Sequence, residues 1–295
     1  MSRDHTTEAE AWSEIRAALP GGAGVHPRAD GTAGRYGIRF LPDSSWTCDG
    51  PVCDAARTLL EIFAPLVSRG DSLVIGQLGQ SLDGRIATDN GASHYINGEA
   101  ARVHLHRLRA IVDAVVIGVG TLNADNPQLT VRHVEGRNPV RVLLDPEGRA
   151  NPQSRVFHDG LARVVHVSAY RAGAGVARAP AGVETLVLPR HAQYGFDPAT
   201  LLQALAARGL GRVLVEGGGL TVSRFLQAGV LHRLHLMVAP MLIGSGRPGV
   251  CLAPITSLDA ALRPRCRVFA CGADSLFDLA LDGAAGGAST SAGVA

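Results

Sequence analysis

The stretch VLVEGGGLTVSRFL, residues 213–226, decides the class of fold. Three aliphatic residues run into Glu216, three glycines follow, and LTVSRFL has the spacing of the first turns of a helix. A buried strand that turns over glycines into a helix is the repeating unit of parallel sheets. Glycines at such a corner let the backbone approach a partner closely, often a phosphate at the helix N-terminus. A carboxylate beside an anion site is unexpected, because it would repel the anion.

The segments on either side continue the alternation of strand and helix. We expect buried strands in SLVIGQLGQSL, AVVIGVG, PVRVLLD, ARVVHVSA, VETLVL and LHRLHLMVAPML, and helices over GEAARVHLHRLRAIV and DPATLLQALAARG. This order predicts an α/β protein with a mostly parallel central sheet covered by helices on both faces, in three α/β/α layers. Residues 1–70 carry no usable motif and are predicted to be an N-terminal extension of unknown role. Residues 71–281 are expected to form the main domain, and 282–295 a disordered tail of small residues.

The composition excludes several classes of protein. The 295 residues are 46% hydrophobic but only 4% aromatic, with 36 glycines, which predicts an aliphatic core and many turns. A net charge of +2 argues against a broad nucleic-acid surface. The polar start is not a signal peptide, no apolar run is long enough for a membrane span, and the five cysteines form neither a disulfide framework nor a zinc pattern. We therefore expect a cytoplasmic protein with reduced thiols, no metal and no membrane partner.

Unusual residues follow four of the predicted strands. The four strand ends read GQSLDGRIA, GVGTLNADNPQLTVR, LLDPEGR and VEGGGLTVSR. Each alone is compatible with an ordinary turn, but ligands bind at the carboxyl ends of such strands, so four together indicate a site. GSGRPG, residues 244–249, fits the dinucleotide pattern G-x-G-x-x-G, but no helix follows it and we interpret it as a turn.

Charged residues and histidines near these ends allow more than one interpretation. Arg109 is compatible with a solvated cation at a helix C-terminus or, together with Arg132, with a phosphate clamp. His104 and His106 are expected on the helix surface. A metal role for His232 and His235 is not expected.

Four segments together resemble the pyrimidine reductase of bacterial riboflavin biosynthesis. These are GQSLDGRIAT, ASHYINGEAARVHLHRLRAIVDAVVIGVGTLNADNPQLTVR, PVRVLLDPEGR and VLVEGGGLTVSRFLQAGVLHRLHLMVAPMLIG, within residues 72–281. The resemblance implies the dihydrofolate-reductase-like fold, a homodimer and reduction of 5-amino-6-(5-phosphoribosylamino)uracil to its ribitylamino form by NADPH. The protein's task would then be to align the reactants and to stabilise charge.

The resemblance also implies two sets of site residues. The substrate site would be lined by Ser93, Arg109, Leu129, Arg132 and Glu216. The cofactor site would be lined by Gly79, Tyr95, Thr121, Asp125, Gly218, Gly219, Leu220, Thr221, Val222, Ser223 and Arg224. Asp125 is also the candidate for handling a proton. Glu216 would face the substrate, and the glycines would face the cofactor, so that the carboxylate stands between two sites.

Three departures from the family pattern are present. Residues 1–70 lack the zinc motif of the deaminase that precedes the reductase in bifunctional relatives, so we expect a stand-alone reductase. Gln77 stands where a lysine is usual, and His232 with Arg233 stands where an Asp-Glu pair is usual. Arg149 is compatible with recognition of a 2′-phosphate or with a solvent-facing role. Because of Gln77, a reductase of another pterin- or pyrimidine-like substrate and a non-catalytic nucleotide-binding sensor remain alternatives.

Overall fold

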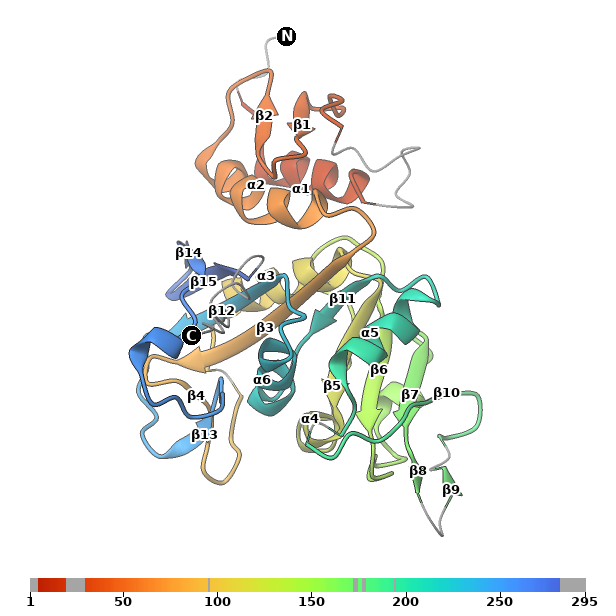
Figure 1. The fold of residues 1–295 in the computed structure, drawn as a ribbon. Helices are drawn as coiled ribbons and strands as arrows, with labels where there is room; N and C mark the ends of the chain where they lie inside the picture. Colours follow the sequence, from red (N-terminus) through yellow and green to blue (C-terminus); the bar gives the residue numbers. More distant parts are fainter. Residues whose placement is uncertain are drawn as a thin grey trace, which may run out of the picture.

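A nine-stranded sheet forms the centre of the computed structural model, which describes residues 5–19, 30–94, 96–171, 175–176, 179–193 and 195–281 (Figure 1). The strand order is β10-β7-β6-β5-β11-β3-β12-β15-β14. Seven neighbouring strands are parallel, namely β3 (Leu73–Ser81), β5 (Ala114–Gly118), β6 (Val140–Asp145), β7 (Val164–Ser168), β10 (Glu184–Val187), β11 (Arg212–Val215) and β12 (Arg233–Ala239). The hairpin of β14 (Arg265–Cys271) and β15 (Asp274–Ala280) adds two antiparallel strands at one edge. The prediction of a mostly parallel sheet is confirmed.

Helices cover both faces of this sheet. Successive strand residues point to opposite faces, so apolar side chains on both faces need to be covered. Val213 and Val215 of β11 pack into one apolar cluster, and Leu214 between them packs into the other. The cluster around Leu214 is completed by α1 (Glu8–Ala17), α2 (Asp54–Val67) and α3 (Glu99–Ala110). The opposite cluster is completed by α5 (Pro198–Ala206) and α6 (Gly219–Gln227). The predicted three layers are therefore present.

Several short elements lie outside the central sheet. They include α4 (Val119–Asp125), the 3-10 turns η1 (Arg155–Phe157) and η2 (Leu258–Ala260), and the paired strands β4 (Arg85–Thr88) and β13 (Gly246–Pro248). The other short pairs are β1 (Ile38–Phe40) with β2 (Trp46–Cys48), and β8 (Tyr170–Arg171) with β9 (Gly175–Val176). The interpretation of GSGRPG as only a turn is wrong, since Gly246–Pro248 is a strand bound to β4.

The N-terminal residues pack on α3 and on the sheet. The ring of Trp12 in α1 meets that of Phe63 in α2 edge-on at 5.6 Å, and Phe63 lies 5.6 Å from the ring of His104 in α3. Residues of α1 and α2 belong to the same apolar cluster as Leu73 and Ile75 of β3. The division of the chain at residue 70 stays a prediction, and the predicted tail 282–295 lies outside the described residues.

The prediction that His104 and His106 lie on the surface is wrong. Their exposed fractions are 5% and 3%, because the packing of α3 turns both side chains into the protein. His104 Nε2 lies 3.0 Å from Nδ1 of His235 on β12, and His235 Nε2 lies 3.2 Å from Oδ1 of Asp278 on β15. Burial and the neighbouring His235 hold the pKa of His104 well below its ordinary value. The two rings therefore form a polar contact inside the core, in which the ring of His104 is neutral.

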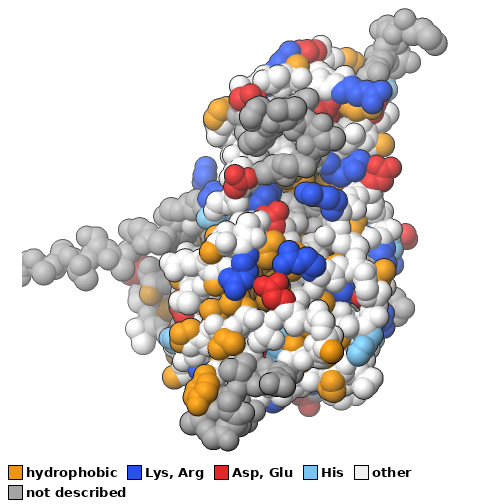
Figure 2. All heavy atoms as spheres, turned by 90° about the vertical axis from the view of Figure 1, so that its right-hand side faces the viewer, with side chains coloured by type: hydrophobic (Ala, Val, Ile, Leu, Met, Phe, Trp, Pro, Cys, Tyr) orange, Lys and Arg blue, Asp and Glu red, His pale blue; other side chains and the backbone are white. Residues whose placement is uncertain are grey.

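Charges of both signs are interspersed on the surface. Figure 2 shows basic and acidic side chains next to one another on one face of the molecule. Such mixing differs from the single-sign field typical of nucleic-acid-binding surfaces. Within the described residues, every helix is too short or too polar to cross a bilayer.

Candidate active site

The carboxyl ends of the central strands open into a cavity of about 920 Å³. Its walls come from the ends of β3, β5, β6 and β11, from the starts of α4 and α6, and from β4, β13 and the residues before α5. The structure brings ten of the predicted site residues to these walls. They are Gly79, Ser93, Thr121, Asp125, Glu216, Gly218, Gly219, Leu220, Thr221 and Arg224.

The cavity extends to both faces of the sheet. Ile75 of β3 packs in the cluster on the α3 side, so Gln77, two residues further on, continues on that side. Leu78 packs in the cluster on the α6 side. Leu105 of α3 and Phe225 of α6 both line the cavity. One cavity therefore has an α3 side and an α6 side, which meet at the strand ends.

Glu216 is neutralised by a buried arginine on the α3 side. Arg109 donates from Nε and Nη2 to the two carboxylate oxygens at 2.8 and 2.7 Å, and from Nη1 to the Thr130 carbonyl at 3.2 Å. The two side chains are only 7% and 6% exposed. A bidentate pair of this kind fixes the orientation of the carboxylate as well as balancing its charge. The carboxylate beside the glycines thus presents much less net charge to an anion than the sequence suggested.

The three glycines have three different roles. Gly217 has a φ of +98°, a left-handed conformation that favours glycine. Gly218 donates its N–H to Thr121 Oγ1 at 2.8 Å, which links the start of α6 to α4. At Gly219 a Cβ atom would stand 2.0 Å from the Gly249 carbonyl oxygen, so only glycine lets the segment after β13 lie against α6.

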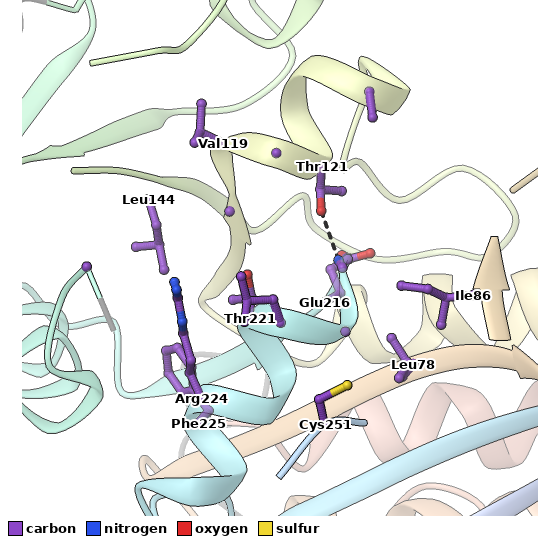
Figure 3. A pocket seen from close by; sticks show the side chains of 18 of the residues that line it. Leu78, Ile86, Val119, Thr121, Leu144, Glu216, Thr221, Arg224, Phe225 and Cys251 are labelled. Atoms are coloured by element: carbon purple, nitrogen blue, oxygen red, sulfur yellow. Dashed lines mark hydrogen bonds between the residues drawn. The ribbon is translucent and has the colours of Figure 1, made fainter. Parts of the chain in front are cut away.

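The α6 side presents a basic group to the cavity. Arg224 is half-buried, and burial lowers its pKa from the ordinary value. In the described part of the chain its guanidinium has no hydrogen-bond or ion-pair partner. Figure 3 shows this side chain extending from α6 toward Leu144, while Leu78 and Ile86 lie on the opposite side of the helix start. A desolvated guanidinium without a partner is suited to bind an anionic ligand.

Other predicted residues lie outside the cavity wall. Leu129 is buried at a φ of +59°, and Val222 is buried in the cluster on the α6 side. Ser223 accepts the Cys251 N–H at 2.8 Å instead of facing a ligand. Tyr95 lies outside the described residues.

Arg132 lies beside the Arg109–Glu216 pair, not in the wall itself. Its Nη1 donates to Gln128 Oε1 at 2.7 Å and to Thr130 Oγ1 at 3.0 Å, while Thr130 O accepts from Arg109. Burial and the neighbouring Arg109 and Arg155 lower its pKa. Arg132 and the nearby Arg155 give this corner a positive potential that suits a phosphate, whereas Arg109 is balanced by Glu216.

Several wall residues were missed by the sequence reasoning. They are Arg190, Gln193 and Phe196 before α5, Arg247 and Pro248 of β13, and Cys251. The only signal for β13 in the sequence is the GSGRPG pattern, which no helix follows. The residues before α5 follow the predicted strand VETLVL, but this strand end is not one of the four that carry unusual residues, and chain topology brings it to the cavity. Arg149 does line the cavity, as one of its two interpretations requires.

The structure shows the contacts of the residues that depart from the family pattern. Gln77 is only 8% exposed and lines the cavity, and the chain contains no lysine at all, so no ammonium group replaces the usual one. His232 Nδ1 accepts the Val74 N–H at 2.8 Å, and Arg233 Nε donates to Asp278 at 2.8 Å. Both residues that replace the Asp-Glu pair are therefore used in contacts within the chain. Among the described residues, no group of three or more His, Cys, Asp or Glu side chains has the arrangement of a metal site.

Comparison with known proteins gives the family. Residues 72–268 match the family described as the RibD C-terminal domain. The chain belongs to this family. Its match with the 2,5-diamino-6-ribosylamino-4(3H)-pyrimidinone 5′-phosphate reductase of Methanothermobacter thermautotrophicus is 35% identical and covers 58% of this chain and 79% of that protein. The riboflavin biosynthesis protein RibD of Aquifex aeolicus is 31% identical over 71% of this chain.

A solved structure agrees with the RibD C-terminal domain assignment. The Thermotoga maritima diaminohydroxyphosphoribosylaminopyrimidine deaminase/5-amino-6-(5-phosphoribosylamino)uracil reductase aligns with a TM-score of 0.60 at 29% identity, over 76% of this chain and 61% of that one. The chain spans 58% of the length of the Aquifex protein. The predicted resemblance and the dihydrofolate-reductase-like fold are thus confirmed.

Proposed function

We propose that the chain reduces 5-amino-6-(5-phosphoribosylamino)uracil to its ribitylamino form with NADPH, as a step of riboflavin biosynthesis. The observation that carries the proposal is one cavity with two unlike sides, the start of α6 with the half-buried Arg224 on one and a neutralised carboxylate on the other. The reductase activities for which the relatives are named support it. One relative is named for the 2,5-diamino pyrimidinone, so the test includes both pyrimidines.

The α6 side fits a nicotinamide dinucleotide. Its anionic groups would be held by the start of α6 and by Arg224, whose half-buried guanidinium has no partner among the described residues. Thr121 fixes that helix start through Gly218. Bound NADPH would supply the hydride. Arg149, exposed on the wall, is available to a 2′-phosphate, which favours NADPH over NADH.

The α3 side fits the pyrimidine and its ribose phosphate. An ionised carboxylate has about four acceptor positions, and Arg109 occupies two on Glu216, so the remainder can accept N–H or O–H donors of the substrate. We assign the phosphate to Arg132 and proton handling to Asp125. Asp125 is exposed and lines the cavity, in a chain that has no lysine to share this role.

The direct test follows NADPH fluorescence and absorbance. The protein should bind NADPH and oxidise it when one of the two pyrimidines is added. Arg132→Ala should raise the KM for that pyrimidine roughly 10- to 150-fold, the value of a charged hydrogen bond, with NADPH affinity nearly unchanged. Arg163→Ala, at an arginine that is 63% exposed and immediately precedes β7, is the matched control.

The other possible results of these measurements lead to different conclusions. NADPH binding without oxidation would favour the sensor or another pterin- or pyrimidine-like substrate. No NADPH binding would refute the proposal. Loss of NADPH affinity in Arg132→Ala, with the pyrimidine KM unchanged, would reverse the assignment of the two sides.

We also propose a cytoplasmic homodimer. All five cysteines are free, as expected in a reducing compartment. Strand β14 ends the sheet order, and Val268 in it is 57% exposed, an arrangement that a second strand can extend. Light scattering on Val268→Lys should show a shift toward monomer, and an unchanged mass would argue against this edge as the interface.

A further inference from the structure

We infer that helix α1 takes part in substrate binding by holding the loop that carries Arg132. The inference gives residues 1–70 a role and rests on the proposed function, since it takes Arg132 as the phosphate-binding residue. Trp12 and Arg16 are the positioning residues.

The loop 131–138 is attached to the protein at both of its ends. The Val131 N–H donates to Asn138 Oδ1 at 2.8 Å, which closes the loop. The Arg132 N–H donates to His106 Nδ1 of α3 at 2.9 Å. Burial, followed by the charges of Arg109 and Arg132, lowers the pKa of His106 to about 3, so its ring stays neutral and can accept this bond.

The tip of the loop is attached to α1. Trp12 Nε1 donates to the Glu135 carbonyl at 3.0 Å, and Arg16 Nη2 donates to the Glu135 carboxylate at 2.6 Å. Glu135 is three residues from Arg132, a span of about 10 Å at most. The attachment to α1 is therefore close enough to fix the backbone of Arg132.

Helix α1 is itself held firmly against α3. Arg107 of α3 donates to Glu8 at 2.7 Å, and its guanidinium lies 5.7 Å from the centre of the Trp12 ring. Trp12 is 6% exposed and packs edge-on against Phe63. Since its ring is fixed on two sides, the Nε1–H is a rigid anchor for the Glu135 carbonyl.

A positioning role of α1 can be distinguished from a purely structural one by replacing its hydrogen-bond donors to the loop while keeping the packing of the core. Trp12→Phe keeps an aromatic ring beside Phe63 but removes the N–H, and Arg16→Gln removes the ion pair. The double variant should raise the pyrimidine KM about three- to tenfold, the range for one or two net hydrogen bonds, while kcat and the KM for NADPH stay within about twofold. Arg39→Gln, which breaks the exposed Arg39–Asp49 pair in the same N-terminal region, is the control and should leave all three constants unchanged.

Hydrogen exchange provides a readout that does not depend on turnover. In the double variant the hydrogen-bonded amides of Val131 and Arg132 should exchange about tenfold faster than in the wild-type protein, with α2 and α3 unchanged. Arg16→Gln alone, which leaves the core intact, should give a smaller change in the same direction. If exchange and the pyrimidine KM match those of Arg39→Gln, the inference is wrong. If the wild-type protein oxidises no NADPH, the proposed function fails, while the exchange result still decides whether α1 holds the loop.

Discussion

The buried pair of Arg109 and Glu216 leads to a quantitative prediction about the free energy of unfolding. Arg109→Met removes the cation and leaves a carboxylate that is 6% exposed without its two hydrogen bonds. Breaking a buried pair from one side costs about 3–5 kcal/mol, because the remaining charge is neither hydrated nor compensated. This is a large part of the roughly 5–15 kcal/mol that stabilises a folded protein. We expect a folded variant with a clearly lower urea midpoint.

Two further variants isolate the cause. Arg109→Met/Glu216→Gln contains no buried charge and should recover to within roughly 2 kcal/mol of the wild-type free energy of unfolding. Arg163→Met breaks a pair with Glu184 in which the side chains are 63% and 40% exposed, and it should cost at most about 1 kcal/mol.

The assay is urea unfolding followed by far-ultraviolet circular dichroism, with free energies taken by linear extrapolation. A loss in Arg109→Met no larger than in Arg163→Met would contradict the reasoning. So would a double variant less stable than the single one, since the carboxylate would then not be the source of the loss.

Two more predictions concern single hydrogen bonds. Thr121→Val removes the acceptor of the Gly218 N–H and should raise the KM for NADPH roughly tenfold. Thr121→Ser keeps the hydroxyl and should keep this KM near the wild-type value. Equal KM values for the two variants would show that the hydrogen bond does not set cofactor affinity. The pKa of His106, about 3, lies below its value of 6.5 in the unfolded chain, so the unfolded state binds the extra proton and stability falls as pH drops from about 6.5 to 3. His106→Gln should reduce this acid-dependent loss of unfolding free energy, and an unchanged pH profile would refute it.

Much of the fold follows from local patterns in the sequence. The aliphatic run before Glu216 forms β11, and the predicted helix DPATLLQALAARG forms α5, where Asp197 accepts the Thr200 N–H at 2.8 Å as the N-cap. These features depend on residues a few positions apart. That the polar residues after the strands lie close together is also predictable, because parallel strands place their carboxyl ends at the same edge of the sheet.

The features that were not predicted depend on residues far apart in the chain. Arg109 and Glu216 are separated by 107 positions, and no local pattern shows that they meet. The burial of His104 depends on His235, 131 positions away. A weak signal was present there, because Ala101, His104 and Leu108 follow the three- and four-residue spacing of one helix face.

The contact between Gly219 and the Gly249 carbonyl bears on how this sequence can diverge. A methyl group at 219 would meet the carbonyls of Pro248 and Gly249 at 2.8 and 2.0 Å, so these positions form one steric unit although 29 residues separate them. Every residue carries a backbone carbonyl, so side-chain changes at 248 or 249 do not relieve this contact, and we expect glycine to be kept at 219 among relatives whatever residues stand there. The glycine run suggests a phosphate site in the sequence, but its third glycine is also required by a contact within the protein. A glycine kept at 219 is for this reason weaker evidence of nucleotide binding than one kept at 218.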